Sequence, residues 1–228
     1  ALSRAYVDYS TSGLENPLSH LLLVMGLTLF LRGAVSFRNL FLLSLIAALG
    51  AVNRMDIILL YAPMIALMLW RLPRLQGLAT AALGFIPLAC WLAFATFYYG
   101  FPYPNTAYAK LNTGIDKAEL LAQGFRYWGF SLQHDPLTPV IVLSGLLLPL
   151  FTRNVRHLMI GGGIVLYALY SLRIGGDFMG GRFLAAPLLC ACALHARLPV
   201  RLRRWHEYVH VAAIAGLAAM ASIPTVLS

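Results

Sequence analysis

Eight apolar runs, each bounded by charged residues or by Gly and Pro, alternate with short polar segments along the chain. The runs cover residues 17–33, 39–52, 57–70, 77–99, 137–151, 158–172, 183–196 and 208–224. A helix that crosses a bilayer needs about 20 predominantly apolar residues, and several of these runs are shorter than that. We therefore expect an all-α fold, a polytopic transmembrane bundle of about eight helices, in which some helices extend into the polar turns or end in a protein-lined cavity.

Composition supports the membrane assignment. Hydrophobic residues make up 60% of the chain and charged residues only 11%, whereas a soluble domain has about 25% charged residues. We expect residues 1–228 to form a single transmembrane domain. The chain begins at Ala1 with neither an initiator Met nor a signal-type segment, so we expect it to be an internal segment of a longer protein.

The net charge of +9 predicts an orientation, because Lys and Arg accumulate in cytoplasmic loops. With residue 1 outside, ten arginines and one glutamate fall in the cytoplasmic turns, while seven bases and seven acids fall on the other side. The basic excess is thus spread over short turns between spans, which excludes a nucleic-acid partner and leaves the lipid bilayer as the expected one.

Cysteine and histidine give no sign of a metal or a disulfide framework. The three cysteines lie inside apolar runs, and the six histidines show no ligand spacing. The sequence therefore requires no cofactor and no structural metal site.

Polar residues concentrate in four non-cytoplasmic elements, at residues 1–16, 53–56, 100–136 and 173–182. The large loop over residues 100–136 begins irregularly and continues as an amphipathic helix, which a capping box of Asp116 and Glu119 starts. We expect this helix to lie in the membrane interface. It either anchors the protein as an aromatic belt or lines a route for a lipid-linked substrate.

Three of these elements carry candidate ligand contacts. In "NRMD", Arg54 and Asp56 either pair with each other or form a phosphate contact in which Asp56 orients Arg54. The loop opening supplies an aromatic face, hydrogen-bonding groups and a cation that suit a sugar and a phosphate, namely Tyr103, Asn105, Thr106, Tyr108 and Lys110. Tyrosines are also common at membrane interfaces without any ligand.

The stretch "RIGGDFMGGR" is the most polar of these elements. Its four glycines allow a cavity-lining turn, with charges at Arg173, Asp177 and Arg182. Charges near the bilayer are costly unless they face water or one another. Either these charges line a cavity, or an ion pair of Asp177 with Arg182 closes the turn.

The ordered series "TSGLENPL", "NRMD", "YYGFPYPNTAYAK" and "RIGGDFMGGRFLAAPLL" resembles the integral-membrane glycosyltransferases of the GT-C class. It is most similar to the group that contains the mycobacterial terminal arabinofuranosyltransferase and the Gram-negative flagellar motor control proteins. The similarity extends from about residue 10 to about residue 195.

The resemblance implies a glycosyltransferase of the bacterial inner membrane whose active face is periplasmic. The donor would be a polyprenyl-phosphate sugar and the acceptor a cell-envelope glycan or a surface protein. At the matching positions, Lys110 and Arg182 would contact the phosphate, with Arg54 next, and Asp177 and Glu15 would orient hydroxyl groups. The class admits a divalent metal.

Two departures from the class qualify this resemblance. The general base of the class usually precedes the region matched here, so we expect it N-terminal to residue 1. A turn of Arg-Pro-Glu type in the class is Arg-Met-Asp in this chain, with Met55 at the proline position.

Two other functions fit a membrane cavity with charges and glycines. A transporter or flippase for a lipid-linked substrate would have repeated halves and polar groups open to both sides, but the chain shows no internal repeat. A non-catalytic assembly factor, for instance of the flagellum, would tolerate replacement of Lys110, Asp177 and Arg182.

Overall fold

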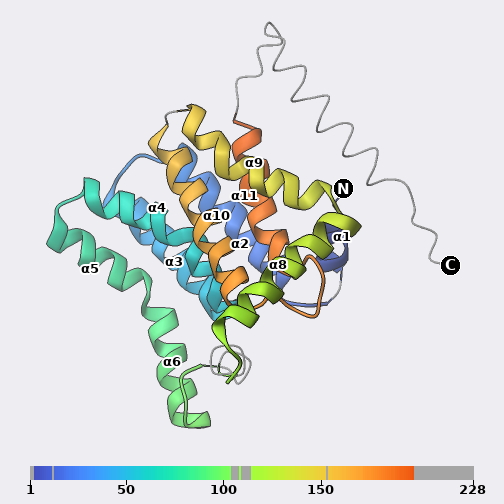
Figure 1. The fold of residues 1–228 in the computed structure, drawn as a ribbon. Coiled ribbons are helices and arrows are strands. Elements are labelled where there is room, and N and C mark those ends of the chain that lie inside the picture. Colours follow the sequence, from blue (N-terminus) through green and yellow to red (C-terminus); the bar gives the residue numbers. More distant parts are fainter. Residues whose placement is uncertain (1–2, 12, 104–107, 109–113, 153, 198–228) are drawn as a thin grey trace, which may run out of the picture.

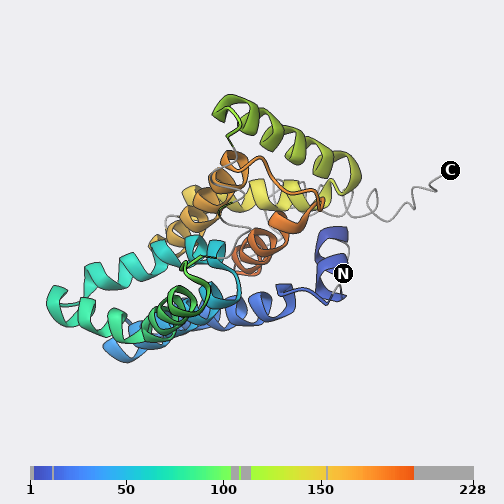
Figure 2. The same cartoon turned by 90° about the horizontal axis from the view of Figure 1, so that it is seen from below.

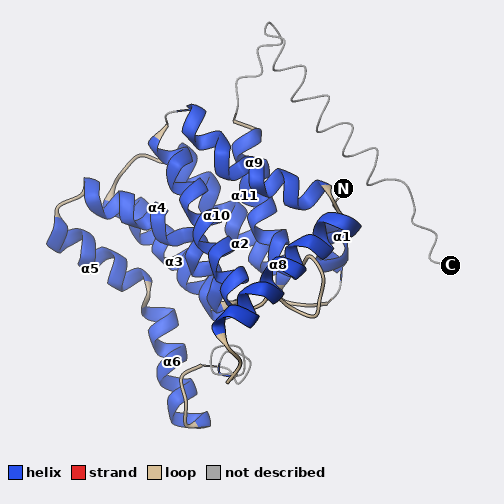
Figure 3. Ribbon diagram, in the orientation of Figure 1, coloured by secondary structure: helices blue, strands red, loops and turns tan. Residues whose placement is uncertain are grey.

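A computed structural model describes residues 3–11, 13–103, 108, 114–152 and 154–197. This part of the chain is built from helices joined by short loops and contains no strand (Figure 3). The expected all-α fold is therefore confirmed for the described residues. The last apolar run, 208–224, lies outside them.

The helices follow the apolar runs closely. The bounds are α1 Arg4–Thr11, α2 Asn16–Arg32, α3 Phe37–Asn53, η1 Met55–Ile57, α4 Ile58–Arg71, α5 Arg74–Gly84, α6 Ile86–Tyr99, α8 Lys117–His134, α9 Leu137–Thr152, α10 Val155–Arg173, η2 Arg182–Leu184 and α11 Ala185–His195 (Figure 1).

Few of these helices are long enough to cross a bilayer by themselves. Among the described residues, α10 alone is long and apolar enough, and the count rises to three if the bent pairs α5–α6 and α8–α9 each form one span. The helices α2, α3 and η2–α11 are apolar but shorter. The eight-span bundle thus remains a prediction.

The run over residues 77–99 is divided rather than continuous. The chain bends by 53° between α5 and α6, at Phe85, whose N–H is bonded to the carbonyls of Ala81 and Ala82. Pro87 occupies the first turn of α6, where a missing N–H needs no partner. An apolar run does not reveal such a break, because both halves are apolar.

The core lies where α10 packs against α4, α9 and α11, and where α2 packs against α3 and α11. Fully buried side chains such as Leu23, Leu43, Ile160 and Ile164 fill it. Gly163 lets α10 approach α4 closely, since a Cβ at this position would lie 2.7 Å from the Leu60 carbonyl oxygen. Small residues at close helix crossings are typical of membrane bundles.

Two helices lie at the edge of this bundle. Helix α6 extends away from it and contacts α3 and α5 (Figures 1 and 2), so its aromatic side chains are largely exposed, for example Phe97 at 91%. Helix α8 packs on α9 and α10 through Gly124, Tyr127 and Ser131, and exposes Phe125 on another face.

The helix expected after Asp116 is therefore confirmed. Asp116 caps α8 by accepting a hydrogen bond from the Ala118 N–H. The exposed apolar face of α8 fits a helix that lies in a membrane interface, and that location stays a prediction.

Candidate functional site

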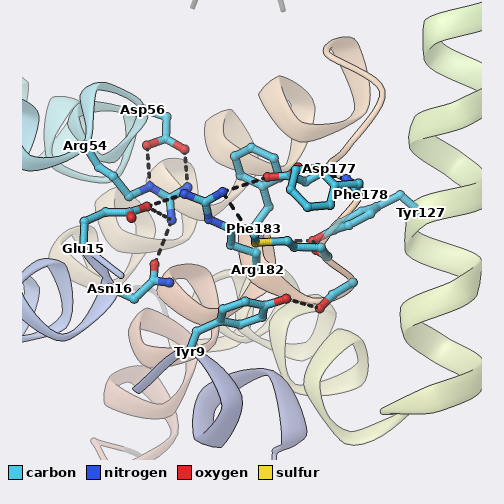
Figure 4. A network of polar contacts seen from close by, with 12 residues as sticks. Tyr9, Glu15, Asn16, Arg54, Asp56, Tyr127, Asp177, Phe178, Arg182 and Phe183 are labelled. Atoms are coloured by element: carbon cyan, nitrogen blue, oxygen red, sulfur yellow. Dashed lines mark hydrogen bonds and ion pairs between the residues drawn. The ribbon is translucent and has the colours of Figure 1, made fainter. Parts of the chain in front are cut away.

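A cleft of about 610 Å³ opens at the end of the bundle where α2, η1 and η2 begin and where α3, α6 and α10 end. We call it the polar cleft. Its polar lining residues are Glu15, Asn53, Arg54, Asp56, Tyr103 and Arg182. Side chains far apart in the sequence meet here, as Figure 4 shows for the charged groups. The polar elements at residues 1–16, 53–56 and 173–182, and the start of the 100–136 loop, all contribute to it.

Arg54 is the most constrained charge of the polar cleft. It lies in extended backbone between α3 and η1, and its side chain is only 8% exposed. Its Nε donates to Asp56 Oδ1 at 2.9 Å and its Nη2 to Asp56 Oδ2 at 2.6 Å. This bidentate geometry is the strong form of an arginine–carboxylate pair. The direct pair expected for "NRMD" is thus present, and because Arg54 also lines the polar cleft, a phosphate contact in which Asp56 orients it stays a prediction.

Further groups surround the Arg54–Asp56 pair. The Tyr167 hydroxyl on α10 donates to Asp56 Oδ2 at 2.7 Å and accepts from Arg54 Nη2 at 2.8 Å. Arg54 Nη1 donates to Asn16 Oδ1 at 2.9 Å. The guanidinium carbon lies 5.3 Å from the centre of the Phe183 ring, which adds a cation–π contact.

Arg182 is the second cation of the polar cleft, and its side chain is 21% exposed. Its Nη2 donates to Glu15 Oε1 at 2.6 Å and its Nη1 to Asp177 Oδ2 at 3.2 Å. The pair of Asp177 with Arg182 that could close the glycine turn is thus present. Arg182 Nε is buried and has no hydrogen-bond partner within the described residues.

Glu15 connects the two arginines. Its Oε1 bonds to Arg182 and lies 3.8 Å from Arg54 Nη1. Burial raises the pKa of Glu15, but the Arg182 hydrogen bond and the charges of both arginines outweigh this, so that the pKa is lowered overall. The carboxylate is therefore ionised at neutral pH and couples α2 to both arginine-bearing turns.

The turn over residues 174–181 is held by neighbouring tyrosines. Tyr127 on α8 accepts a hydrogen bond from the Phe183 N–H at 3.0 Å, and the Tyr9 hydroxyl donates to the Gly180 carbonyl at 2.9 Å. Gly176 has a φ of +77°, and a Cβ there would lie 2.5 Å from Tyr127 Cγ. Only glycine combines this backbone conformation with so close a neighbour, so α8 fixes the turn that carries Arg182.

Aromatic side chains also line the polar cleft, and we call them the aromatic wall. They are Trp91, Tyr99, Phe101, Tyr103, Tyr170 and Phe183. Charges and ring faces in one cleft suit a ligand with an anionic group and an amphipathic body, because ring faces can pack against apolar or C–H-rich surfaces.

Four of the ten candidate residues line the polar cleft, namely Glu15, Arg54, Tyr103 and Arg182. Asp177 bonds to Arg182 without lining the cleft. Tyr108 is exposed, with its ring centre 6.1 Å from that of Tyr103. Arg173 is exposed at the end of α10 and is not a lining residue. Lys110, Asn105 and Thr106 lie outside the described residues.

Sequence reasoning missed Asn16, Tyr167 and the cleft-lining Trp91 and Tyr99 of α6. Tyr167 is one of several tyrosines in apolar runs, and no local signal marks its partner Asp56. Asn16 belongs to "TSGLENP", where it resembles an ordinary turn residue. A tyrosine inside a membrane run that faces a charged turn is the only signal that could have suggested Tyr167.

Metal ligands do not gather at this site. Within the part of the chain that the structure describes, no group of three or more His, Cys, Asp or Glu side chains could hold a metal ion.

No family model matches the chain, and no solved structure matches it. It is similar to a terminal β-(1→2)-arabinofuranosyltransferase of Mycobacterium tuberculosis (strain ATCC 25618 / H37Rv), with 33% identity over 233 aligned residues. The match covers 86% of this chain and 36% of the relative, so the chain spans about a third of that protein. The similarity supports a relationship between this chain and a glycosyltransferase.

Proposed function

We propose that the chain is the core of a membrane glycosyltransferase. It transfers a sugar from a polyprenyl-phosphate donor to a cell-envelope glycan or a surface acceptor, on the periplasmic side of the bacterial inner membrane. The observation that carries this proposal is the polar cleft, in which two arginines, the carboxylates of Glu15 and Asp56 and an aromatic wall meet at one end of an apolar helical bundle.

Arg182 is the group best placed to bind the donor phosphate. It lines the polar cleft, and its side chain is more exposed than that of Arg54, at 21% against 8%. An arginine fork binds a phosphate through two parallel hydrogen bonds. A guanidinium beside the phosphate also stabilises the charge that develops when the sugar–phosphate bond breaks. Lys110 is assigned to the same phosphate from the resemblance alone.

Glu15 and Asp177 are the groups assigned to hydroxyls. Glu15 lines the polar cleft and is held ionised by Arg182, so it can accept hydrogen bonds from a sugar or an acceptor. The aromatic wall offers Trp91 and Tyr99 as surfaces for the C–H face of a sugar ring or for the first isoprene units. The exposed apolar surface of α6 continues from this wall.

Transfer assays with the full-length protein in membranes or nanodiscs test the proposal. The protein is supplied with polyprenyl-phosphate-linked pentoses and hexoses, beginning with arabinofuranose because the relative is an arabinofuranosyltransferase. Wild type is compared with Arg182→Ala, Asp177→Asn and Lys110→Ala. Removal of a charged group that contacts the leaving phosphate is expected to lower turnover about 100-fold.

Arg126→Ala is the matched control, because Arg126 is an exposed arginine on α8 outside the polar cleft. Turnover of this variant should stay near wild type. Unchanged turnover in all three site variants would remove the site assignment, and absence of transfer from every lipid-linked sugar would remove the proposed reaction. Movement of the lipid-linked sugar across a vesicle membrane without transfer would identify a flippase instead.

A further inference from the structure

One buried hydroxyl outside the polar cleft is bonded to both members of its most buried ion pair. Tyr167 on α10 is 1% exposed and does not line the cleft. Its hydroxyl contacts Asp56 at 2.7 Å and Arg54 at 2.8 Å. We infer that Tyr167 is a positioning residue for the cleft: it fixes the Arg54 guanidinium, which in turn fixes Glu15 and so the binding arginine, Arg182. This inference rests on the proposed function.

The hydrogen bonds of Arg54 explain how a fixed guanidinium acts on its neighbour. A guanidinium has five N–H groups in a rigid plane. Nε is bonded to Asp56, Nη2 is bonded to both Asp56 and Tyr167, and Nη1 is bonded to Asn16. One N–H of Nη1 is left over, and Glu15 Oε1 lies 3.8 Å from that nitrogen.

Tyr167 therefore decides where this last N–H points. Without the hydroxyl, Nη2 loses one acceptor, and the guanidinium can rotate about the Asp56 contact. The electrostatic attraction at Glu15 then changes, and with it the position of the carboxylate that holds Arg182 at 2.6 Å. The effect reaches the ligand only through Arg54 and Glu15 and leaves Arg182 charged and in the cleft, so it should weaken binding of the donor equally in the ground state and the transition state and appear in KM.

The chain offers a closely matched control in Tyr61 on α4. Tyr61 is also fully buried, at 0% exposure. Its hydroxyl has no hydrogen-bond partner within the described residues. Tyr61→Phe and Tyr167→Phe thus remove the same atom from equally buried tyrosines, and only the second removal breaks contacts with the charged pair.

The test measures KM for the lipid-linked donor, kcat and melting temperature for full-length wild type, Tyr61→Phe, Tyr167→Phe, Arg54→Lys and the Tyr167→Phe/Arg54→Lys double variant. Tyr167→Phe should raise the donor KM about tenfold and leave kcat within about twofold. This factor matches a lost hydrogen bond to a charged group, about 1.4 kcal/mol. Tyr61→Phe should leave KM unchanged.

The double variant separates positioning from simple support of the fold. If Tyr167 acts through Arg54, its removal should have no further effect on KM once Arg54 is replaced by lysine, which is strong coupling in a double-mutant cycle. A KM for Tyr167→Phe equal to that of Tyr61→Phe overturns the inference. A Tyr167→Phe change that raises KM by the same factor in the wild-type and Arg54→Lys backgrounds also overturns it. The same holds if the KM increase is explained by the loss of melting temperature.

Should Tyr167→Phe not purify in folded form, Asp56→Asn takes its place in the cycle, because it weakens the acceptor shared by Arg54 and Tyr167. Asp56→Asn should then raise KM in the wild-type background and have no further effect on KM in the Arg54→Lys background. Wild-type protein without transferase activity contradicts the proposed function, whereas active wild type with an unaffected Tyr167→Phe contradicts only the positioning role.

Discussion

The two arginine-bearing turns of the polar cleft differ in how far their cations are already bonded to the protein. Arg54 is 8% exposed and has donors bonded to Asp56, Tyr167 and Asn16. Arg182 is 21% exposed, bonds to two carboxylates and retains an Nε without a partner among the described residues. Arg54, bonded to three partners and nearly buried, serves the architecture of the site, whereas the more exposed Arg182 can exchange a carboxylate for a ligand.

Removal of each cation in turn gives the largest expected effect and tests this difference directly. Arg54→Ala leaves Asp56 buried without its cation, which typically costs about 3–5 kcal/mol. Arg182→Ala removes the cation of Glu15, which is 22% exposed and can be solvated, and of Asp177, which is 3% exposed but also accepts from the Phe178 N–H, so it should cost somewhat less, about 2–3 kcal/mol. Melting temperatures of the purified full-length variants measure both, with Arg126→Ala as the exposed control. Equal losses would show that both arginines are structural.

The next effect concerns the rigidity of the turn that carries Arg182. Gly176→Ala places a Cβ against Tyr127 at a φ of +77° and should destabilise the protein by about 1–3 kcal/mol. The control is Gly129→Ala on α8, where a Cβ would meet no atom within 4 Å.

A glycine-to-alanine change in an open helical position should stabilise α8 by about 0.5–1 kcal/mol. Thermal unfolding of both variants gives the comparison. A Gly176→Ala protein as stable as Gly129→Ala would mean that α8 does not constrain the turn.

The smallest expected effect is the pH dependence of the link between the two turns. Glu15→Gln should cost about 1 kcal/mol at neutral pH, since it weakens a charge-assisted hydrogen bond to Arg182. The pKa of Glu15 in the folded protein lies below its ordinary value of 4.5. The carboxylate therefore contributes stability above about pH 4.5, and the contribution is lost as pH falls through the folded pKa.

Melting temperatures of wild type and Glu15→Gln between pH 7 and pH 3 should thus converge on acidification. If the difference in melting temperature between the two proteins stays constant from pH 7 to pH 3, the charge of Glu15 does not contribute to stability.

The helices were predictable from the sequence, because a long apolar run in a membrane has few other ways to form the hydrogen bonds of its backbone N–H and C=O groups. Helices α2, α3, α9 and α10 begin and end within three residues of the predicted runs. The break at Phe85 was not predictable, since it lies inside a run whose two halves are equally apolar. Its position depends on Pro87 and on the packing of α5 against α3.

The candidate site was predictable only in part. Charges in polar turns are conspicuous in an apolar sequence, and so Glu15, Arg54, Asp177 and Arg182 could be named. The local pairs Arg54–Asp56 and Asp177–Arg182 could be named as alternatives, but the pairing of Glu15 with Arg182 could not, because these residues are separated by 167 positions. Tyr167 could not be named either, since only the packing of α10 against α4 brings its hydroxyl to Asp56.

The sequence separation of these ion pairs has a consequence for biosynthesis. Arg54 and Asp56 are two positions apart and can neutralise each other as soon as both leave the ribosome. Glu15 must wait for Arg182, a delay of roughly 10–30 s at 5–20 residues per second. During this interval Glu15 has only the longer ion pair with Arg54, at 3.8 Å, and lacks the hydrogen-bonded one with Arg182, which favours keeping the start of α2 in water until Arg182 has been made.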